Sequence, residues 1–185
     1  SVSHMGFVVL GLAALTPIGF SGAALQMFNH GIITGAMFLL VGVLYDRAHT
    51  RDLNAFGGIR QVAPVFSGIL IFFSLASLGL PGLSGFVSEF LSLLGAFNTF
   101  RLFTIISVIG IVITAGYILY MLQRLLLGPL NEKWKNFPEI NTREIITLVP
   151  LLIIVLALGV YPRIALDIIN PALNQILTCT GALLK

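Results

Sequence analysis

Long apolar segments separated by short polar stretches make up the hydrophobic pattern of this chain. Five such segments can be drawn: Val2 to Leu15, Gly22 to Tyr45, Pro64 to Asn98, Leu102 to Leu127 and Ile145 to Tyr161. A helix that crosses a bilayer core of ~30 Å needs ~20 apolar residues, and lipid offers its backbone no water to bond. The pattern therefore predicts an all-α integral membrane protein with about five transmembrane helices.

Polar positions mark two loops and a tail. The loops cover residues 46–61 and 128–143, and both carry several basic side chains. After Pro162 apolar residues alternate with polar ones, namely Asp167, Asn170, Asn174 and Gln175. Such alternation is typical of an amphipathic helix that lies at the membrane interface. We therefore expect a transmembrane helical domain over residues 1–162 and an interfacial tail over residues 163–185.

The third segment is too long for one ordinary crossing, because its 35 residues would extend ~50 Å as a straight helix. It forms either two spans or one broken span, and Lys and Arg in short loops favour the cytoplasmic side. One crossing places seven of the ten basic residues on one side: Arg47, Arg51, Arg60, Arg124, Lys133, Lys135 and Arg143. The other side then has Arg101, Arg163 and Lys185. Two crossings would remove this asymmetry, so the charges favour one discontinuous helix.

The break is expected in the stretch LPGLSGFVSEF, from Leu80 to Phe90. Pro81 removes a backbone donor, and three glycines between residues 79 and 85 allow conformations that other residues resist. Unwound backbone at membrane depth is tolerated only where it is buried in protein or lines a wet cavity. We therefore expect the helix to unwind near Leu80 to Ser84 and to mark a polar interior.

Composition supports this class and excludes others. Hydrophobic residues make up 57% of the chain, charged residues 9%, and the mean hydropathy is +1.03, outside the range of soluble domains. The net charge of +3 comes from a few loop residues and gives no nucleic-acid signal. The single cysteine, Cys179, excludes an internal disulfide, a thiolate iron–sulfur cluster and a zinc finger. We therefore expect no redox metal chemistry here, and we expect the natural protein or a companion chain to continue upstream of Ser1.

Four ionisable side chains lie within the predicted spans: His4, His30, Glu89 and Arg124. Arg124 lies three residues from a predicted helix end, so we expect its side chain to reach the interface. The other three lie deep, where a charged group costs ~2.5–3.5 kcal/mol on insertion scales, and a functional role is the default interpretation.

Glu89 follows the predicted break by one to two helical turns. A nearby helix N-terminus favours its charged form, whereas burial favours its neutral form. A carboxyl group balanced in this way can change protonation when a neighbouring charge changes, which a proton relay requires. The alternative is a carboxylate that only caps the broken helix.

His30 belongs to a polar stripe in which Gln26, His30 and Thr34 recur every four residues, with Asn29 adjoining. Histidine titrates near neutral pH and can pass a proton through either ring nitrogen. His30 therefore either relays protons or makes an interhelical hydrogen bond worth ~0.6–2 kcal/mol. His4 allows the same two interpretations.

Other interpretations remain open for three features. His4 and His30 could instead be axial ligands of a haem in an electron carrier, which a visible absorption spectrum would reveal. Gly31-x-x-x-Gly35 permits close helix packing. Residues 45–52 mix charges of both signs, as in a docking or folded loop element or a solvated charge run.

Four stretches together resemble a known family: Ser3 to Phe7, Gln26 to Gly31, Leu44 to Arg51, and Leu80 to Phe90. Over essentially the whole chain they are similar to the C-terminal part of the antiporter-like chain 4 (M-type) subunits of proton-pumping NADH:quinone oxidoreductase, respiratory complex I. The resemblance implies a fourteen-helix subunit with two inverted five-helix repeats, of which this chain holds roughly the second repeat and the last helix.

The resemblance also implies site residues and partners. Glu89 matches the glutamate of the family's second discontinuous helix, and His4 and His30 match its central histidines. They would act as a proton relay coupled to quinone reduction, without a cofactor in this chain and without contact to NADH or quinone. The glutamate–lysine pair and the first broken helix of the family would lie upstream of Ser1, so this chain alone should not form a complete path.

We therefore expect a proton-translocating membrane-arm subunit in an energy-transducing membrane, which is bacterial inner, mitochondrial inner or thylakoid. Its partners would be other membrane-arm subunits, including antiporter-like neighbours and an upstream N-terminal part, together with lipids and no nucleic acid. The alternative is a subunit of a multisubunit cation/proton antiporter or a membrane-bound hydrogenase. A third possibility is a scaffold that conducts nothing.

Overall fold

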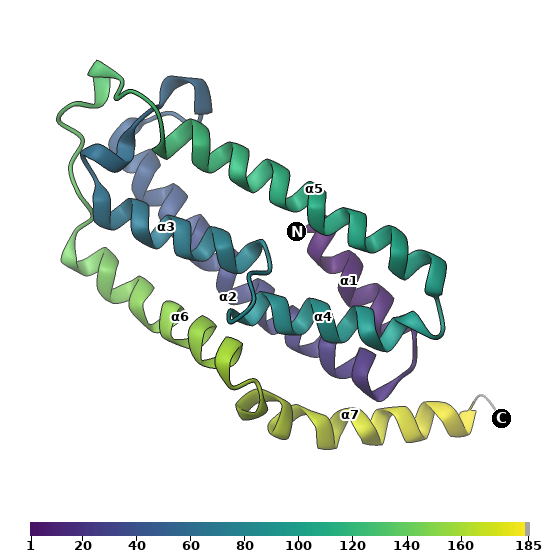
Figure 1. The fold of residues 1–185 in the computed structure, drawn as a ribbon. Coiled ribbons are helices and arrows are strands. Elements are labelled where there is room, and N and C mark those ends of the chain that lie inside the picture. The colour runs from purple at the N-terminus through teal and green to yellow at the C-terminus, as the bar shows by residue number, and fades with distance from the viewer. Residues whose placement is uncertain (184–185) are drawn as a thin grey trace.

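The computed structural model describes residues 1–183 and shows an elongated arrangement of helices (Figure 1). Seven α-helices follow one another along the chain: α1 (Val2–Ala13), α2 (Pro17–Ala48), α3 (Pro64–Ser77), α4 (Ser84–Phe97), α5 (Arg101–Leu126), α6 (Thr142–Val160) and α7 (Arg163–Leu183). Three 3-10 turns lie in the loops: η1 (Leu53–Ala55), η2 (Ile59–Gln61) and η3 (Glu132–Trp134). The described residues contain no strand, which confirms the all-α prediction.

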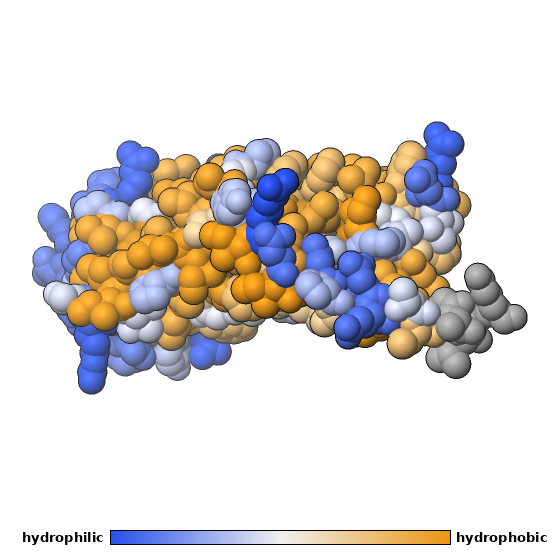
Figure 2. Space-filling view, turned by 90° about the horizontal axis from the view of Figure 1, so that it is seen from below, coloured by the Kyte–Doolittle hydropathy of each residue, from blue (hydrophilic) through white to orange (hydrophobic). Residues whose placement is uncertain are grey.

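Three helices, α2, α5 and α6, are long and apolar enough to cross a membrane, with 32, 26 and 19 residues. α1, α3 and α4 are shorter apolar helices of 12, 14 and 14 residues. Figure 2 shows apolar residues over much of one long face, with hydrophilic residues at one end and in a second patch that runs from the middle of the face toward the other end. This surface is what a lipid environment requires of a multi-pass protein.

α2 begins five residues earlier than the hydrophobic pattern predicts. The Thr16 side chain accepts a hydrogen bond from the Gly19 backbone N–H at 3.1 Å, and Pro17 occupies the first helical position. Both are strong helix-start signals, because the cap satisfies a free N–H and proline has none to lose. The apolar pattern alone does not show this boundary.

The predicted discontinuous helix is present, with the break at residues 78–83 between α3 and α4. Gly79 and Gly82 have φ angles of +81° and +95°, a region that only glycine enters at low cost. Ser84 is already the first residue of α4, so the expected unwound stretch of Leu80 to Ser84 begins and ends slightly too late. The positive φ at Gly79 explains why α3 already ends at Ser77.

Close contact between α2 and α4 falls at glycines other than Gly31 and Gly35. A Cβ atom built on Gly22 of α2 would lie 2.4 Å from the Ser92 backbone nitrogen of α4, so only glycine fits there. Cβ atoms on Gly31 and Gly35 would meet no atom of the described residues within 4 Å. Gly31-x-x-x-Gly35 thus makes no close contact among the described helices, and its packing against a helix outside them stays a prediction.

The two polar loops lie together at one end of the molecule, as one crossing of the third segment requires (Figure 1). The Trp134 indole N–H donates to the Ala55 carbonyl at 2.8 Å, and its ring stacks on Phe56 with centroids 5.4 Å apart. The Gly58 N–H donates to the Leu127 carbonyl at 3.1 Å. Lys185, which the charge argument places at the opposite side, lies outside the described residues.

The tail predicted as amphipathic forms helix α7 up to Leu183, and residues 184–185 of that prediction lie outside the described part. α7 leads on from α6 after a bend and packs against α2, where Ser21 Oγ lies 2.7 Å from Asn170 Oδ1 (Figure 1). Its position at a membrane surface stays a prediction.

Candidate functional site

Glu89 is buried in the second turn of α4, with 5% of its surface exposed. Its Oε1 lies 2.9 Å from Nδ1 of His4 on α1 and accepts a hydrogen bond from Nε2 of Gln26 on α2 at 3.4 Å. His4 is itself only 8% exposed. Three helices therefore bring an acid, a base and an amide to one point in the interior of the described chain.

The broken helix closes this site from a fourth side. A Cβ atom on Gly79 would lie 3.1 Å from Oε2 of Glu89, so the unwound backbone passes close to the carboxylate. The Ser77 hydroxyl, at the end of α3, lies 3.3 Å from Nε2 of His4. The break thus does what the sequence predicts, since it places irregular backbone and polar groups beside the ionisable residue.

His30 belongs to the same cluster but does not touch Glu89. Its ring centroid lies 5.4 Å from that of His4, with the two planes at 41°. Its Nε2 lies 3.0 Å from the Ser1 hydroxyl, and its Nδ1 lies 3.1 Å from the Thr34 hydroxyl. His30 is thus one step further from the carboxylate than His4.

Both nitrogens of each histidine ring are engaged by side chains in this arrangement. His4 has Glu89 and Ser77 as partners, and His30 has Ser1 and Thr34. Both histidines thus take part in side-chain hydrogen bonds, and the expected absence of a haem stays a prediction.

A small cavity lies inside the cluster, with a volume of about 10 Å³. This is about the space that one water molecule needs. Its lining combines the site residues with small or apolar neighbours from α2, α3 and α4: His4, Gln26, His30, Ile33, Ala76, Ser77, Gly85 and Glu89. A wider hollow of about 310 Å³ begins at the same two histidines and extends to Tyr117 and Met121 on α5.

The polar stripe predicted on α2 divides between two neighbours. Gln26 and Asn29 point toward α4, whereas His30 and Thr34 bond each other. Sequence reasoning missed Ser84 and Ser88 of α4, which meet Asn29: its Nδ2 donates to the Ser84 carbonyl at 2.8 Å and to the Ser88 hydroxyl at 3.0 Å. Serines at residues 84, 88 and 92 recur every four positions, and this spacing is the signal that could have found them.

A second charged cluster joins the helices at the end of the molecule where the two polar loops lie. Arg47 of α2 donates to both carboxylate oxygens of Glu144 on α6, at 3.0 and 2.8 Å. Glu139 accepts hydrogen bonds from the free backbone N–H groups of Val65 and Phe66 at the start of α3. The mixed charges of residues 45–52 are thus partly a folded element, because Arg51 also lies over the Tyr45 ring, 4.6 Å from its centroid.

Arg124, the fourth ionisable residue of the predicted spans, lies on an exposed part of α5. Its Nε donates to the Tyr120 hydroxyl at 3.2 Å. It takes no part in the Glu89 cluster.

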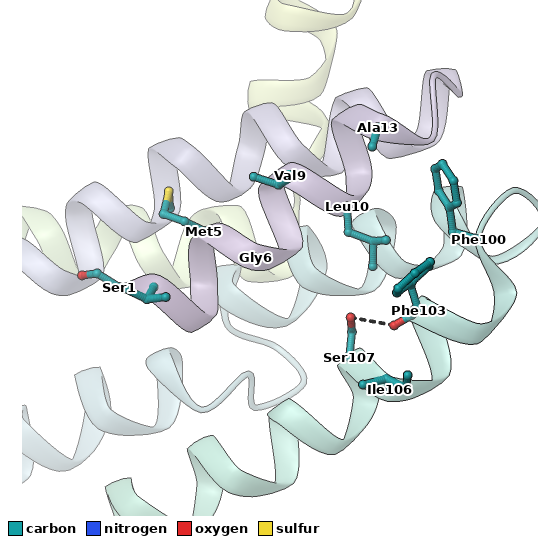
Figure 3. Close-up of a pocket in the computed structure, with 11 residues that line it drawn as sticks. Ser1, Met5, Gly6, Val9, Leu10, Ala13, Phe100, Phe103, Ile106 and Ser107 are labelled. Atoms are coloured by element: carbon teal, nitrogen blue, oxygen red, sulfur yellow. Dashed lines mark hydrogen bonds between the residues drawn. The ribbon is translucent and has the colours of Figure 1, made fainter.

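Another hollow, of about 750 Å³, lies between α1 and α5 and shares Ser1 with the hollow beside the histidines (Figure 3). Figure 3 shows Met5, Val9, Leu10 and Phe103 at its wall, and the Ser107 hydroxyl bonds the Phe103 carbonyl of its own helix. No His, Asp, Glu, Lys or Arg side chain lines this hollow in the described chain. It offers apolar contact and no proton chemistry.

Fold and site together define a class: a multi-pass helical membrane protein with a carboxylate–histidine pair beside a discontinuous helix. The sequence matches the family "NADH:quinone oxidoreductase/Mrp antiporter, TM" over residues 1–114. The chain belongs to this family of energy-transducing membrane proteins, and the predicted resemblance is confirmed.

Three comparisons describe its position within the family. The chain is 42% identical over 177 residues to NADH-quinone oxidoreductase subunit M of Rhodobacter capsulatus, covering 95% of this chain and 35% of that protein. Its fold matches a chain of respiratory complex I from Thermus thermophilus with bound NADH, with a TM-score of 0.85 and 30% identity over 94% of this chain and 37% of the other. A chain of the Mrp complex from Dietzia matches with a TM-score of 0.79, 19% identity and coverage of 93% and 40%, which shows the fold alone.

The chain spans about a third of the length of the curated relatives it matches, with 35% and 33% for the first two.

Proposed function

We propose that this chain is part of a proton-translocating membrane-arm subunit of NADH:quinone oxidoreductase and carries part of its proton path. The observation that carries this proposal is the buried Glu89–His4 pair, with atoms 2.9 Å apart beside the helix break. Ionisable groups inside a membrane are costly even when paired, and those that occur there commonly mark ion and proton pathways. The 42% identity to a subunit M supports this complex, whereas the chain of the Mrp complex from Dietzia matches with 19% identity.

The geometry allows a proton to move between three titratable groups. When His4 is protonated and Glu89 is ionised, the proton on Nδ1 can pass to Oε1 along their hydrogen bond, which leaves both groups neutral. The two histidine rings, with centroids 5.4 Å apart, share no hydrogen bond in the described structure. A single water in the 10 Å³ cavity between them would complete the link to His30.

A change in a nearby charge would drive this transfer in either direction. Electrostatic interactions are strong in a buried, low-dielectric site, so a charge that arrives from outside the chain shifts the balance between ionised and neutral Glu89. We propose that quinone reduction elsewhere in the complex supplies that change. Neighbouring membrane-arm subunits and the upstream part of the protein would complete the path, and this chain itself would perform no redox step and hold no cofactor.

The direct test replaces Glu89 by glutamine in the full-length subunit of the assembled complex. Gln keeps the size of the side chain and its hydrogen-bonding ability, but it cannot take up a proton. We expect quinone reduction to continue while the number of protons pumped per electron falls, measured in liposomes with a pH-sensitive dye. Glu132→Gln, the same chemical change at an exposed loop residue, is the matched control.

Unchanged pumping per electron in Glu89→Gln would remove Glu89 from the path. A scaffold predicts a different result: a complex that fails to assemble, whereas complexes that do assemble pump normally. The number of protons pumped per electron in the assembled Glu89→Gln complex therefore separates conduction from a purely structural role.

A further inference from the structure

Behind Glu89 lies a second line of polar residues that the proton path does not use. Gln26, Asn29 and Ser88 are 2%, 1% and 0% exposed, and they connect the carboxylate to the start of α4. Side chains that polar and that deeply buried are costly unless they are hydrogen-bonded. The hydrogen bonds that they make therefore decide which atom of each side chain donates and which accepts.

The donor and acceptor atoms of these three side chains decide which way each hydrogen bond points. The Asn29 amide nitrogen can only donate, and it donates to the Ser88 hydroxyl and to the Ser84 carbonyl. The Ser88 proton has three acceptors in range: Gln26 Oε1 and the carbonyls of Ser84 and Gly85. Because those carbonyls also serve the helix and Ser88 is the one donor found for Gln26 Oε1 in the described chain, the Ser88 hydroxyl donates to Gln26.

The last link reaches the site itself. With its oxygen held by Ser88, the Gln26 amide must turn its nitrogen toward Glu89, and it donates to Oε1 at 3.4 Å. Each member thus donates toward the carboxylate, and successive hydrogen bonds of one direction polarise one another. Hydrogen bonds to a carboxylate favour its charged form.

We infer that Asn29, Ser88 and Gln26 form a hydrogen-bond chain, polarised toward Glu89, that holds the carboxylate in its ionised form until a proton arrives from His4. These three are positioning residues for the proton relay, and the inference rests on the proposed function. They orient the Glu89 carboxylate as an acceptor beside His4.

The Asn29 end of this hydrogen-bond chain has an acceptor that can take one more donor. Asn29 Oδ1 is buried and has no partner in the described part of the chain, and the same holds for the Ser84 hydroxyl oxygen. An ordered water is the usual partner of such groups. A water that donates to Asn29 Oδ1 would strengthen the same polarity.

The groups that set the charge around Glu89 come from each neighbouring helix. His4 of α1 and His30 of α2 are the titratable ones at its cavity, within the described chain. α3 and α4 contribute Ala76, Ser77 and Gly85, which carry no charge. Substitution of a neutral residue therefore leaves the titratable groups around Glu89 in place.

The test compares two serines on one helix. Ser88 and Ser92 are both fully buried on α4, but the Ser92 hydroxyl donates to the Ser88 carbonyl and has no link to Gln26 or Glu89 in the described structure. Infrared difference spectra of the assembled complex, recorded across pH, follow the carbonyl stretch of protonated Glu89. The band that Glu89→Gln abolishes identifies this group.

Loss of this hydrogen-bond chain should let protonated Glu89 persist to higher pH. For Gln26→Leu, which removes a donor to a charged group, we expect a shift of about one to two pH units. Ser88→Ala should give a smaller shift in the same direction, and Ser92→Ala should give none. Titrations of Gln26→Leu and Ser88→Ala that coincide with wild type, or an equal shift in Ser92→Ala, would overturn the inference.

Two further readouts keep the outcome clear. If Ser88→Ala does not assemble, Asn29→Leu breaks the chain one link further back at similar volume, and it must shift the band in the same direction. The titration of Glu89 does not depend on pumping. Normal pumping in Glu89→Gln would therefore refute the proposed function and leave this titration standing, whereas unshifted titrations would refute only the hydrogen-bond chain.

Discussion

Arg47 should be essential for the stability of the loop end of the protein. Its guanidinium donates to Glu144 through both terminal nitrogens, to the Val43 carbonyl at 3.0 Å and to the Glu139 carbonyl at 3.2 Å. These contacts join α2 to α6 and to the loop before α6. Bidentate pairs of this kind are the strong charge-assisted hydrogen bonds of proteins.

The magnitude follows from burial. The Arg47 side chain is 9% exposed and that of Glu144 is 24% exposed. Removing one partner of a buried pair costs ~3–5 kcal/mol, and the partial exposure of Glu144 lowers this value because water can solvate the carboxylate left behind. We expect Arg47→Met to lower the free energy of unfolding by about 2–3 kcal/mol. Glu144→Gln, which keeps an acceptor for the Asn141 backbone N–H, should lower it by about 1–2 kcal/mol.

A double-mutant cycle isolates the pair. Unfolding of the full-length subunit by SDS in mixed micelles would be measured for wild type, both single variants and the double variant. We expect a coupling free energy of about 1.5–2 kcal/mol, above the 0.2–1 kcal/mol of exposed ion pairs. Arg143→Met, which removes the same charge from an exposed neighbour, is the control. A coupling below about 0.5 kcal/mol would show that the pair acts as a surface ion pair and that the argument from burial is wrong.

Two other substitutions test the packing that holds the site. Gly22→Ala should destabilise the same subunit by about 1–3 kcal/mol, because its Cβ would lie 2.4 Å from the Ser92 backbone nitrogen. Gly31→Ala, in open space among the described residues, should be harmless in the same SDS assay. Glu139→Ala should lower the free energy of unfolding by about 1–2 kcal/mol, because it leaves the Val65 and Phe66 N–H groups at the start of α3 without their acceptor. Glu132→Ala is the exposed control. Equal stabilities of the two variants would contradict the role of Glu139 as a helix cap.

Local rules account for the parts of the fold that the sequence predicts well. Length and hydropathy indicate helices α2, α5 and α6, since each needs only its own residues to satisfy its backbone in lipid. The break near Pro81 is also local, because positive φ angles at Gly79 and Gly82 depend on the residue type itself. Glu89 is identifiable for a related reason: an ionisable residue inside an apolar segment is costly wherever it lies.

The partners of Glu89 required the tertiary structure. His4 is 85 positions away in sequence and proves to be its direct partner, whereas His30 lies one step further away. The stripe on α2 indicates polar residues on a helix but not that Asn29 faces α4 while Thr34 bonds His30. Helical periodicity places residues on one face of one helix, and it carries no information about which other helix meets that face.

The sequence by itself thus determined the class of the protein, the discontinuous helix and the acid at its centre. Only the tertiary structure decided which base lies beside that acid and which neutral groups bond to it. It also showed that α2 packs closely against α4 at Gly22, whereas Gly31 meets no atom of the described residues within 4 Å. The physical reason is that hydropathy and backbone freedom belong to single residues, whereas hydrogen bonds and close packing belong to pairs that lie far apart in sequence and meet only when the chain folds.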